Sequence, residues 1–459
     1  MIYYVLLFLS FLITFYWLVF NKNSFYNVAI NSVSLLDAML SDEEENLKLN
    51  SIQKYTVLAF KSLAVLLFIL IIGLILVLII PLSFSYFRDL NLKDLDWTSL
   101  NSIFAICLGS SIPLIFPFQK KMSGYTELSK LLHILILDNY NIGLKLFSRE
   151  VKKYSKNISN KNCFVIVSGL ARSGTTSLTE SLHRTDVFSS LDYSNMPFLL
   201  APNMWKNFYR PKKKELRERS HKDGILMGLD TVEALEEYFF KVINNDNYID
   251  EKSLQTHIIS KNNYELYMKY QKIIRKNSSK IYLAKNNNFI LRYKSMINYN
   301  QSFKMIVLFR HPLYHAASLL NQHFRNIQLQ KDNTFAIKYM QWLGHHEFGT
   351  NHKPFNFKND FNINNFDLTS LNYWLEIWIN YYNYILKILD SQIVLIKYED
   401  YCKSPEKTIK YIFNSIDIKH NLNKLVSFEN NRKIDHEYSE SLLIKALKIY
   451  SSLESLKNF

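Results

Sequence analysis

CFVIVS, from Cys163 to Ser168, runs directly into GLARSGTTSL, from Gly169 to Leu178. The first six residues are mostly apolar and do not alternate with polar ones, which is typical of a strand buried on both faces of a parallel sheet. Gly169 and Gly174 allow a tight turn that points backbone N–H groups at an anion, and a helix beginning near Thr175 adds the positive end of its dipole. The stretch predicts a phosphate-binding loop in an α/β fold, with a mainly parallel sheet of P-loop type and helices on both faces.

The loop departs from the one found in nucleotide kinases and NTPases. Thr175 stands where the GxxxxGK[ST] pattern has its lysine, and the cation is Arg172, three residues earlier. Two later apolar segments lead into basic residues, Lys285 and Arg310, rather than into a carboxylate. A magnesium-dependent kinase needs carboxylates for its metal, whereas sulfuryl transfer can use Arg, Lys and backbone N–H groups alone. A kinase or NTPase is therefore the less favoured enzyme.

The residues RSGTT, Arg172 to Thr176, resemble the 5′-phosphosulfate loop of the sulfotransferases that use 3′-phosphoadenosine 5′-phosphosulfate (PAPS). The arginine form is the one found among carbohydrate and bacterial members of that family. The resemblance implies that PAPS is the co-substrate and that no metal is needed. It also implies a set of donor-binding residues, namely Gly169, Arg172, Ser173, Gly174, Thr175 and Thr176.

A second segment, KMIVLFRHP from Lys304 to Pro312, predicts a strand that ends in Arg310, and Ser318 follows eight residues later. This spacing resembles the family's 3′-phosphate site, where an arginine at a strand end and a serine in the next helix bind the phosphate that distinguishes PAPS from simpler nucleotides. Pro312 suits the first turn of a helix, which puts Ser318 about two turns along it. A hydroxyl beside a guanidinium gives charge-assisted hydrogen bonds to a dianion. Arg310 and Ser318 therefore join the predicted donor site.

A third segment, IVLIKYED from Ile393 to Asp400, is followed by Pro405 and a predicted helix from Glu406. It resembles the strand and helix found late in the same fold, and we expect a structural role for it. The resemblance covers about Asn162 to Ile418. Bacterial membrane-associated sulfotransferase-like proteins are the nearest in character.

Transfer at this loop needs a cation for the leaving group and a base for the acceptor. Arg172 is the expected cation. Lys285 follows the short strand that begins at Ile281. If that strand is parallel to the first, Lys285 faces the mouth of the sheet, where ligands gather. The alternative for Lys285 is an ordinary surface lysine.

The base remains open between several residues. Carbohydrate-sulfating relatives often use a glutamate shortly after the first helix, where this chain has only Asp192. His221 stands two residues from Asp223, which could orient its ring, and histidine titrates near neutral pH. Glu236 and Glu237 could also serve, although a capping or salt-bridge role suits them as well. We expect His221 to be the base, with Asp192 as its competitor.

Two more clusters invite interpretation. His345 to Glu347, with His352, suggest a metal site, but no second cluster with ligand spacing supports one. The segment between Tyr339 and Phe355 is better interpreted as an acceptor-binding loop. The aromatic tract from Tyr373 to Tyr384 falls at helical spacing and predicts core packing rather than a platform for stacking on a sugar.

The charge balance points to an anionic ligand. The formal net charge is +15, and residues 119–459 alone carry 49 Lys and Arg against 32 Asp and Glu, a net of +17. No zinc-finger, homeodomain or RRM signature accompanies this charge, so nucleic acid is not an expected partner. The three cysteines have no CxxC spacing, which indicates neither a disulfide framework nor a zinc site.

The residues before 125 predict a membrane region. Ile2 to Phe20 and Ser62 to Phe87 are uncharged runs, each long enough to cross about 30 Å of hydrocarbon. Trp97 to Gln119 is a weaker third candidate because Asn, Ser and Pro dilute it. The first run lacks the basic start and small-residue cleavage site of a signal peptide.

The basic residues of the loops predict the orientation. The first loop and the segment after the third run carry Lys22, Lys48, Lys54, Lys61, Lys120 and Lys121. The second loop carries only Arg88 and Lys93, so the positive-inside rule predicts an outside N-terminus and a cytoplasmic catalytic half. We expect a membrane region with two or three transmembrane helices over 1–124, a linker over 125–160 and a sulfotransferase domain over 161–459.

Together these features predict an integral-membrane, PAPS-dependent sulfotransferase whose acceptor is a hydroxyl or amine, on a saccharide or lipid-linked glycan. Two alternatives remain beside it. One is the P-loop kinase or NTPase, and the other is a scaffold that keeps the PAPS-type fold, has lost catalysis and organises a membrane complex. The presence of Arg172, Arg310 and Ser318 argues against the scaffold.

Overall fold

The computed structural model describes residues 2–88, 96–116, 126–156, 158–159, 161–210, 217–218, 226–227, 231–275, 277, 279–357, 367–419 and 436–457. The chain divides into two compact units, Met1–Ile142 and Gly143–Phe459. This division falls inside the stretch 125–160, where helices α5 (Glu127–Leu137) and α6 (Tyr140–Tyr154) form.

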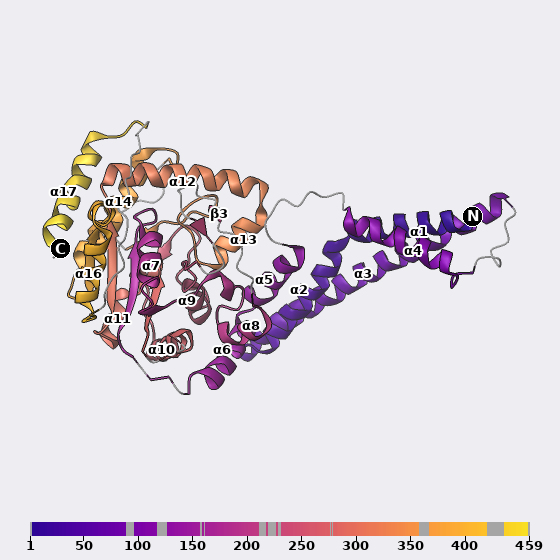
Figure 1. Ribbon diagram of the computed structural model, residues 1–459, viewed down its shortest axis with the longest axis horizontal. Helices are drawn as coiled ribbons and strands as arrows, with labels where there is room; N and C mark the ends of the chain where they lie inside the picture. Colours follow the sequence, from indigo (N-terminus) through magenta and orange to yellow (C-terminus); the bar gives the residue numbers. More distant parts are fainter. Residues whose placement is uncertain are drawn as a thin grey trace. The chain divides into compact units, whose positions relative to one another are not determined.

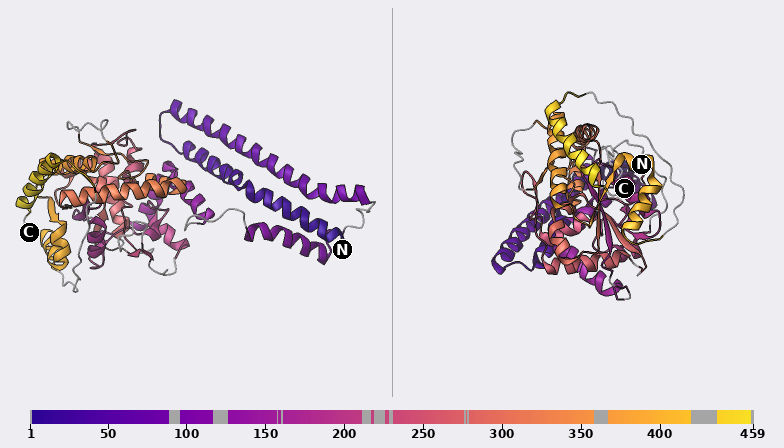
Figure 2. Two further views of the ribbon diagram at one scale, coloured as in Figure 1. Left: turned by 90° about the horizontal axis from the view of Figure 1, so that it is seen from above. Right: turned by 90° about the vertical axis from the view of Figure 1, so that its left-hand side faces the viewer.

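The first unit is helical in its described residues, with α1 (Ile2–Phe20), α2 (Lys22–Met39), α3 (Glu45–Arg88) and α4 (Leu100–Ile115) ahead of α5. Helix α1 packs against both α3 and α4, and α2 packs against α3 (Figure 2). By length and composition, α1 and the Glu45–Ser83 part of α3 are apolar enough to cross a membrane, whereas α4 is a shorter apolar helix. Membrane insertion itself stays a prediction.

The second unit is built on a five-stranded sheet in the order β2-β6-β1-β7-β9. Its strands are β1 (Phe164–Gly169), β2 (Phe188–Ser189), β6 (Ile281–Lys285), β7 (Lys304–Phe309) and β9 (Ile393–Lys397), and every pairing between them is parallel. All residues of β1 are buried, as expected for the central strand. The predicted fold class is confirmed.

Helices cover both faces of this sheet (Figure 1). Val165 and Val167 of β1 belong to a core with Leu178 of α7 (Thr175–His183) and Ile409 of α16 (Pro405–Ser415). On the opposite face, Phe164 stacks on the ring of Phe303 and meets the ring of Tyr267 edge-on. The alternation of side chains along β1 therefore feeds two separate cores.

The aromatic tract forms part of helix α14 (Leu371–Ile388). Trp374, Trp378, Tyr381 and Tyr382 are all buried there, which confirms the prediction of core packing. Tyr382 donates a hydrogen bond to the carbonyl of Leu308 at 2.7 Å and so supports the end of β7.

The remaining helices complete the second unit. They are α8 (Pro202–Phe208), α9 (Glu237–Asn244), α10 (Lys261–Arg275), α11 (Tyr293–Tyr299), α12 (Pro312–Asp332), α13 (Thr334–Trp342), α15 (Tyr398–Lys403) and α17 (Glu440–Leu456), with short 3₁₀ helices η2 (Tyr193–Asn195) and η3 (Asn287–Leu291). Two small sheets pair β3 (Arg217–Glu218) with β4 (Leu226–Met227) and β5 (Leu254–Gln255) with β8 (Phe355–Asn356).

The sheet topology determines where ligands can bind. Because β1 lies between β6 and β7, the loop after β1 has the carboxyl ends of those two strands on either side. The register places Lys285 of β6 beside Val167 and Leu308 of β7 beside Gly169. In open parallel sheets this edge is the usual place for a ligand.

Candidate active site

The loop after β1 requires its glycines. Gly169 and Gly174 have φ angles of 153° and 99°, which favour glycine. A Cβ at Gly169 would lie 2.6 Å from the Ser173 hydroxyl oxygen, and one at Gly174 would lie 2.5 Å from the ring of Tyr398. Helix α7 begins at Thr175, as predicted. The loop therefore has the compact turn and helix N-terminus that a phosphate cradle needs.

The loop lies between the ends of β6 and β7, which we call its β6 side and its β7 side. Two side chains on the β7 side hold carbonyl groups of this loop. His315 lies with its Nε2 atom 2.7 Å from the carbonyl oxygen of Ala171, and Arg310 donates to the carbonyl of Arg172 at 3.5 Å. Burial, and then the charge of Arg310, lower the pKa of His315 to about 3, so its ring is neutral and Nε2–H is the donor. With these carbonyls held, the loop can turn N–H groups toward an anion.

The hydroxyl group of Ser173 indicates that the loop suits an anionic group. The Ser173 Oγ atom is buried and has no hydrogen-bond partner among the residues that the structure describes. Buried polar groups are usually paired, so an unpaired one beside a helix N-terminus fits a ligand with acceptor oxygens. The residues present therefore fit the phosphosulfate group implied by the sequence.

The β7 side of the loop gathers the predicted 3′-phosphate residues. Arg172 Nε lies 3.4 Å from Ser318 Oγ, so both predicted motifs meet at one place. Arg310 and Ser318 are 5% and 3% exposed, and Ser318 lies on α12, which begins at Pro312 as expected. The guanidinium of Arg310 also lies over the ring of Tyr398, 4.9 Å from its centroid.

The segment Tyr398 to Asp400, which follows β9, supports this arrangement. Tyr398 packs against the backbone at Gly174 and under Arg310. Glu399 accepts a hydrogen bond from the backbone N–H of His311 at 2.9 Å, next to the start of α12. Both residues position the donor site through other groups, which matches the structural role expected from the sequence.

The β6 side of the loop brings together a pair that the sequence did not single out. Lys285, at the end of β6, forms an ion pair with Glu233 at 2.8 Å, and both side chains are 10% exposed. Glu233 also accepts a hydrogen bond at 3.4 Å from Thr176, in the first turn of α7. A carboxylate is thus attached to the helix that follows the loop. The available signal was the run EALEE, in which Glu236 and Glu237 drew attention instead of Glu233.

The other base candidates occupy different positions. Asp192 precedes η2, where it accepts hydrogen bonds from the backbone and hydroxyl of Ser194 and closes a capping box. His221 lies outside the described residues, as does its neighbour Asp223. The structure thus assigns Asp192 a local capping role.

Glu236 and Glu237 are deeply buried. Glu236 accepts hydrogen bonds from Tyr267 and Tyr282 at 2.5 and 2.8 Å, and burial raises its pKa. Glu237 pairs with both terminal nitrogens of Arg292 at 2.6 Å. Burial raises the pKa of Glu237, but the charge of Arg292 and the hydrogen bonds from Arg292, Tyr248 and Asn286 together outweigh burial and leave that pKa lowered. These contacts give both residues structural roles.

The fold and loop define an α/β protein of P-loop type that presents anion-binding groups at the carboxyl edge of a parallel sheet. The family model described as sulfotransferase domain matches residues 164–445, more than half of the chain. The chain therefore belongs to the sulfotransferase family and is an enzyme that transfers sulfuryl groups. Members of this family generally use PAPS.

The comparisons with individual proteins are more distant. A sulfotransferase from Mycobacterium tuberculosis shares 12% identity, with a TM-score of 0.35 over 81% of this chain and 94% of its own. A sulfotransferase from Alicyclobacillus acidocaldarius shares 13% identity, with a TM-score of 0.34 over 66% of this chain and 98% of its own. No curated protein matches the sequence significantly.

Proposed function

We propose that this enzyme transfers the sulfuryl group of PAPS to a hydroxyl or amine on a saccharide or lipid-linked glycan. The observation that carries the proposal is the placement of two unlike groups on either side of one loop. Arg172, Arg310 and Ser318 gather on the β7 side, and Glu233 with Lys285 lies on the β6 side. The first set suits a phosphate dianion, and the second suits proton transfer beside a cation.

On the β7 side, Arg310 and Ser318 would bind the 3′-phosphate. Because Arg172 Nε lies 3.4 Å from Ser318 Oγ, we assign Arg172 to phosphate binding as well, rather than to the leaving-group oxygen. The loop N–H groups and the hydroxyls of Ser173, Thr175 and Thr176 would hold the 5′ end. Bound PAPS supplies the sulfuryl group and leaves as adenosine 3′,5′-bisphosphate.

On the β6 side, Glu233 would act as the general base in place of His221 or Asp192. Its carboxylate takes the proton of the acceptor hydroxyl while the new oxygen–sulfur bond forms. Lys285 stabilises the negative charge that develops on the leaving oxygen as the old sulfur–oxygen bond breaks. The hydrogen bond from Thr176 to Glu233 would hold the base at a fixed position relative to the donor site.

We further propose that α1 and α3 anchor the enzyme in a membrane, with its catalytic unit in the cytoplasm. Many apolar side chains of α3 are exposed, including Phe68 at 64% and Leu74 at 62%, as expected for a lipid-facing helix. The lysines predicted for a first loop lie in helices, Lys22 in α2 and Lys48, Lys54 and Lys61 in the first half of α3, and they support this orientation. Lys120 and Lys121 lie outside the described residues. A reporter fused after Phe459 should be active in the cytoplasm, and activity only outside would contradict the orientation.

The direct test of the function uses the purified full chain with labelled PAPS and membrane glycan extracts. Label is expected to move to the glycan fraction, with release of adenosine 3′,5′-bisphosphate. A chain that binds the bisphosphate but transfers label to nothing would support the inactive scaffold instead. Transfer to protein or to simple phenols in preference to glycans would overturn the proposed acceptor class.

A further inference from the structure

A second carboxylate lies near the β6 side of the loop. Glu347 belongs to the segment between α13 and β8. Its Oε1 atom accepts a hydrogen bond from Asn287 Nδ2 at 3.4 Å, and its Oε2 atom lies 3.5 Å from His345 Nδ1. The sequence predicts an acceptor-binding loop between Tyr339 and Phe355, but it assigns no role to Glu347 or Asn287, and neither residue takes part in the reaction described above.

Asn287 carries the observation that points to a ligand. It follows Lys285 by two residues, at the ligand-binding edge of the sheet, and is 6% exposed. Its Oδ1 atom is buried and has no hydrogen-bond partner among the residues described in the structure. Because the amide nitrogen donates to Glu347, the oxygen cannot be exchanged with it without setting two acceptors against each other. An acceptor atom therefore remains free beside a carboxylate.

The charge of Glu347 is secured by its surroundings. Burial raises its pKa, but the charge of His345 and then other groups, including Lys285, outweigh burial and lower that pKa to about 2. Asn287, which donates to Glu347, follows Lys285 by two residues, and this places Glu347 near the lysine that pairs with Glu233. Glu347 is therefore an ionised hydrogen-bond acceptor over the whole physiological range.

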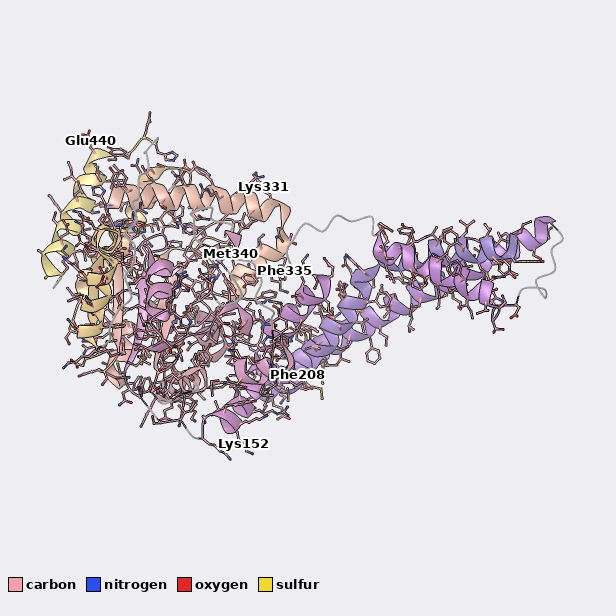
Figure 3. The ribbon with its side chains drawn as sticks, viewed as in Figure 1. Lys152, Phe208, Lys331, Phe335, Met340 and Glu440 are labelled. Atoms are coloured by element: carbon pink, nitrogen blue, oxygen red, sulfur yellow. The ribbon has the colours of Figure 1, made fainter. Side chains whose placement is uncertain are left out.

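The segment that carries Glu347 is held firmly at both ends. Gly344 has a φ of 66°, and a Cβ there would lie 2.6 Å from Glu237. Gly349 has a φ of 83°, and the following Thr350 N–H donates to Gln330 at 2.7 Å. Gln330 lies in the last turn of α12 and also contacts Met340 of α13. Figure 3 labels Lys331 on α12 and Met340 on α13. A segment fixed in this way can present Glu347 in one position.

We propose that Glu347 and Asn287 form a subsite for two neighbouring hydroxyl groups of a saccharide acceptor, beside Glu233 and Lys285. This inference rests on the proposed function. The subsite offers two adjacent acceptor atoms, so it requires two adjacent donors, which a sugar diol supplies and a simple alcohol does not. An amine would also donate to these two atoms, and the test therefore includes one as the competing acceptor.

The test compares three small acceptors that share one alkyl chain, namely octyl β-glucoside, 1-octanol and octylamine, with labelled PAPS as donor. The wild-type chain should prefer the glucoside. Glu347→Gln, which keeps the size of the side chain, should lower kcat/KM for the glucoside by about 10–100-fold and leave the rate toward 1-octanol nearly unchanged. Asn287→Ala should act in the same direction. Glu406→Gln on the surface of α16 is the control and should change neither.

Calorimetry with adenosine 3′,5′-bisphosphate separates this inference from the proposed function. Both variants should bind it like the wild type and keep the wild-type unfolding midpoint. Equal losses toward the glucoside and 1-octanol, a preference for octylamine, or bisphosphate binding with no sulfation of the glucoside would each overturn the subsite. Failure of the wild-type chain to bind the bisphosphate would instead overturn the proposed donor site and the subsite with it.

Discussion

The two predicted 3′-phosphate residues on the β7 side of the loop come from the end of one strand and the helix that follows it. The residues on the β6 side come from segments that are distant in the sequence. Arg310 and Ser318 are eight residues apart, but Glu233 and Lys285 are 52 residues apart. A phosphate site can be encoded locally because a strand end and the next helix turn always lie close together. A site for proton transfer has no such constraint, and only the fold brings its members together.

The largest expected effect tests the β6 side. Glu233→Gln should lower the single-turnover rate by about 10²–10⁴-fold, because it removes the proposed base while keeping its shape. Binding of adenosine 3′,5′-bisphosphate should change little. His221→Ala and Asp192→Asn are the matched controls, and both should turn over normally. A folded Glu233→Gln enzyme with an ordinary rate, or a large loss in either control, would move the base elsewhere.

The next effect tests the β7 side. Arg310→Ala should weaken binding of adenosine 3′,5′-bisphosphate by about 1.5–3 kcal/mol, the value of a hydrogen bond to a charged group. Binding of adenosine 5′-phosphate, which lacks the 3′-phosphate, should be almost unaffected. Calorimetry on both nucleotides measures the difference. Equal losses for the two would show that Arg310 does not contact the 3′-phosphate.

These two variants also mark what could be read from the sequence. The strand, glycine turn and helix around Gly169 and Gly174, and the Arg310–Ser318 spacing, follow from local rules, and the structure brings these residues together. The run EALEE contains Glu233, but the sequence did not single it out, because its importance depends on its contacts with Thr176 and Lys285. Glu236 and Glu237 are equally prominent in the sequence, but the fold buries both of them in the core.

A third prediction tests the packing beneath the loop. Gly174→Ala should lower the free energy of unfolding by about 1–3 kcal/mol, because alanine is strained at a φ of 99° and its Cβ would meet the ring of Tyr398. Removing the ring with Tyr398→Ala should reduce the additional cost of Gly174→Ala. Gly73→Ala, where the nearest atom would be 3.5 Å away, is the control and should be tolerated. Equal costs at both glycines would contradict the account of the loop.

A fourth prediction concerns pH. The pKa of His315 is about 3 in the folded chain, against about 6.5 in an unfolded one. The stability from neutral His315 is therefore fully present above about pH 6.5 and is lost as pH falls toward 3. His315→Gln keeps a donor for Ala171 but cannot titrate. As pH falls from 6 to 4, the unfolding free energy of the wild type should therefore decrease more steeply than that of the variant, by about 1.4 kcal/mol per pH unit. Urea unfolding at several pH values measures both free energies, and parallel pH profiles for the wild type and the variant would contradict this prediction.

The most direct test of the division between the two sides measures Glu233→Gln, Arg310→Ala and the double variant together. Each is assayed for bisphosphate affinity and for the single-turnover rate at saturating PAPS. The account predicts that Glu233→Gln loses rate and keeps affinity, that Arg310→Ala loses affinity and keeps most of its saturated rate, and that the double variant combines both losses additively. An Arg310→Ala enzyme as slow at saturation as Glu233→Gln would contradict it.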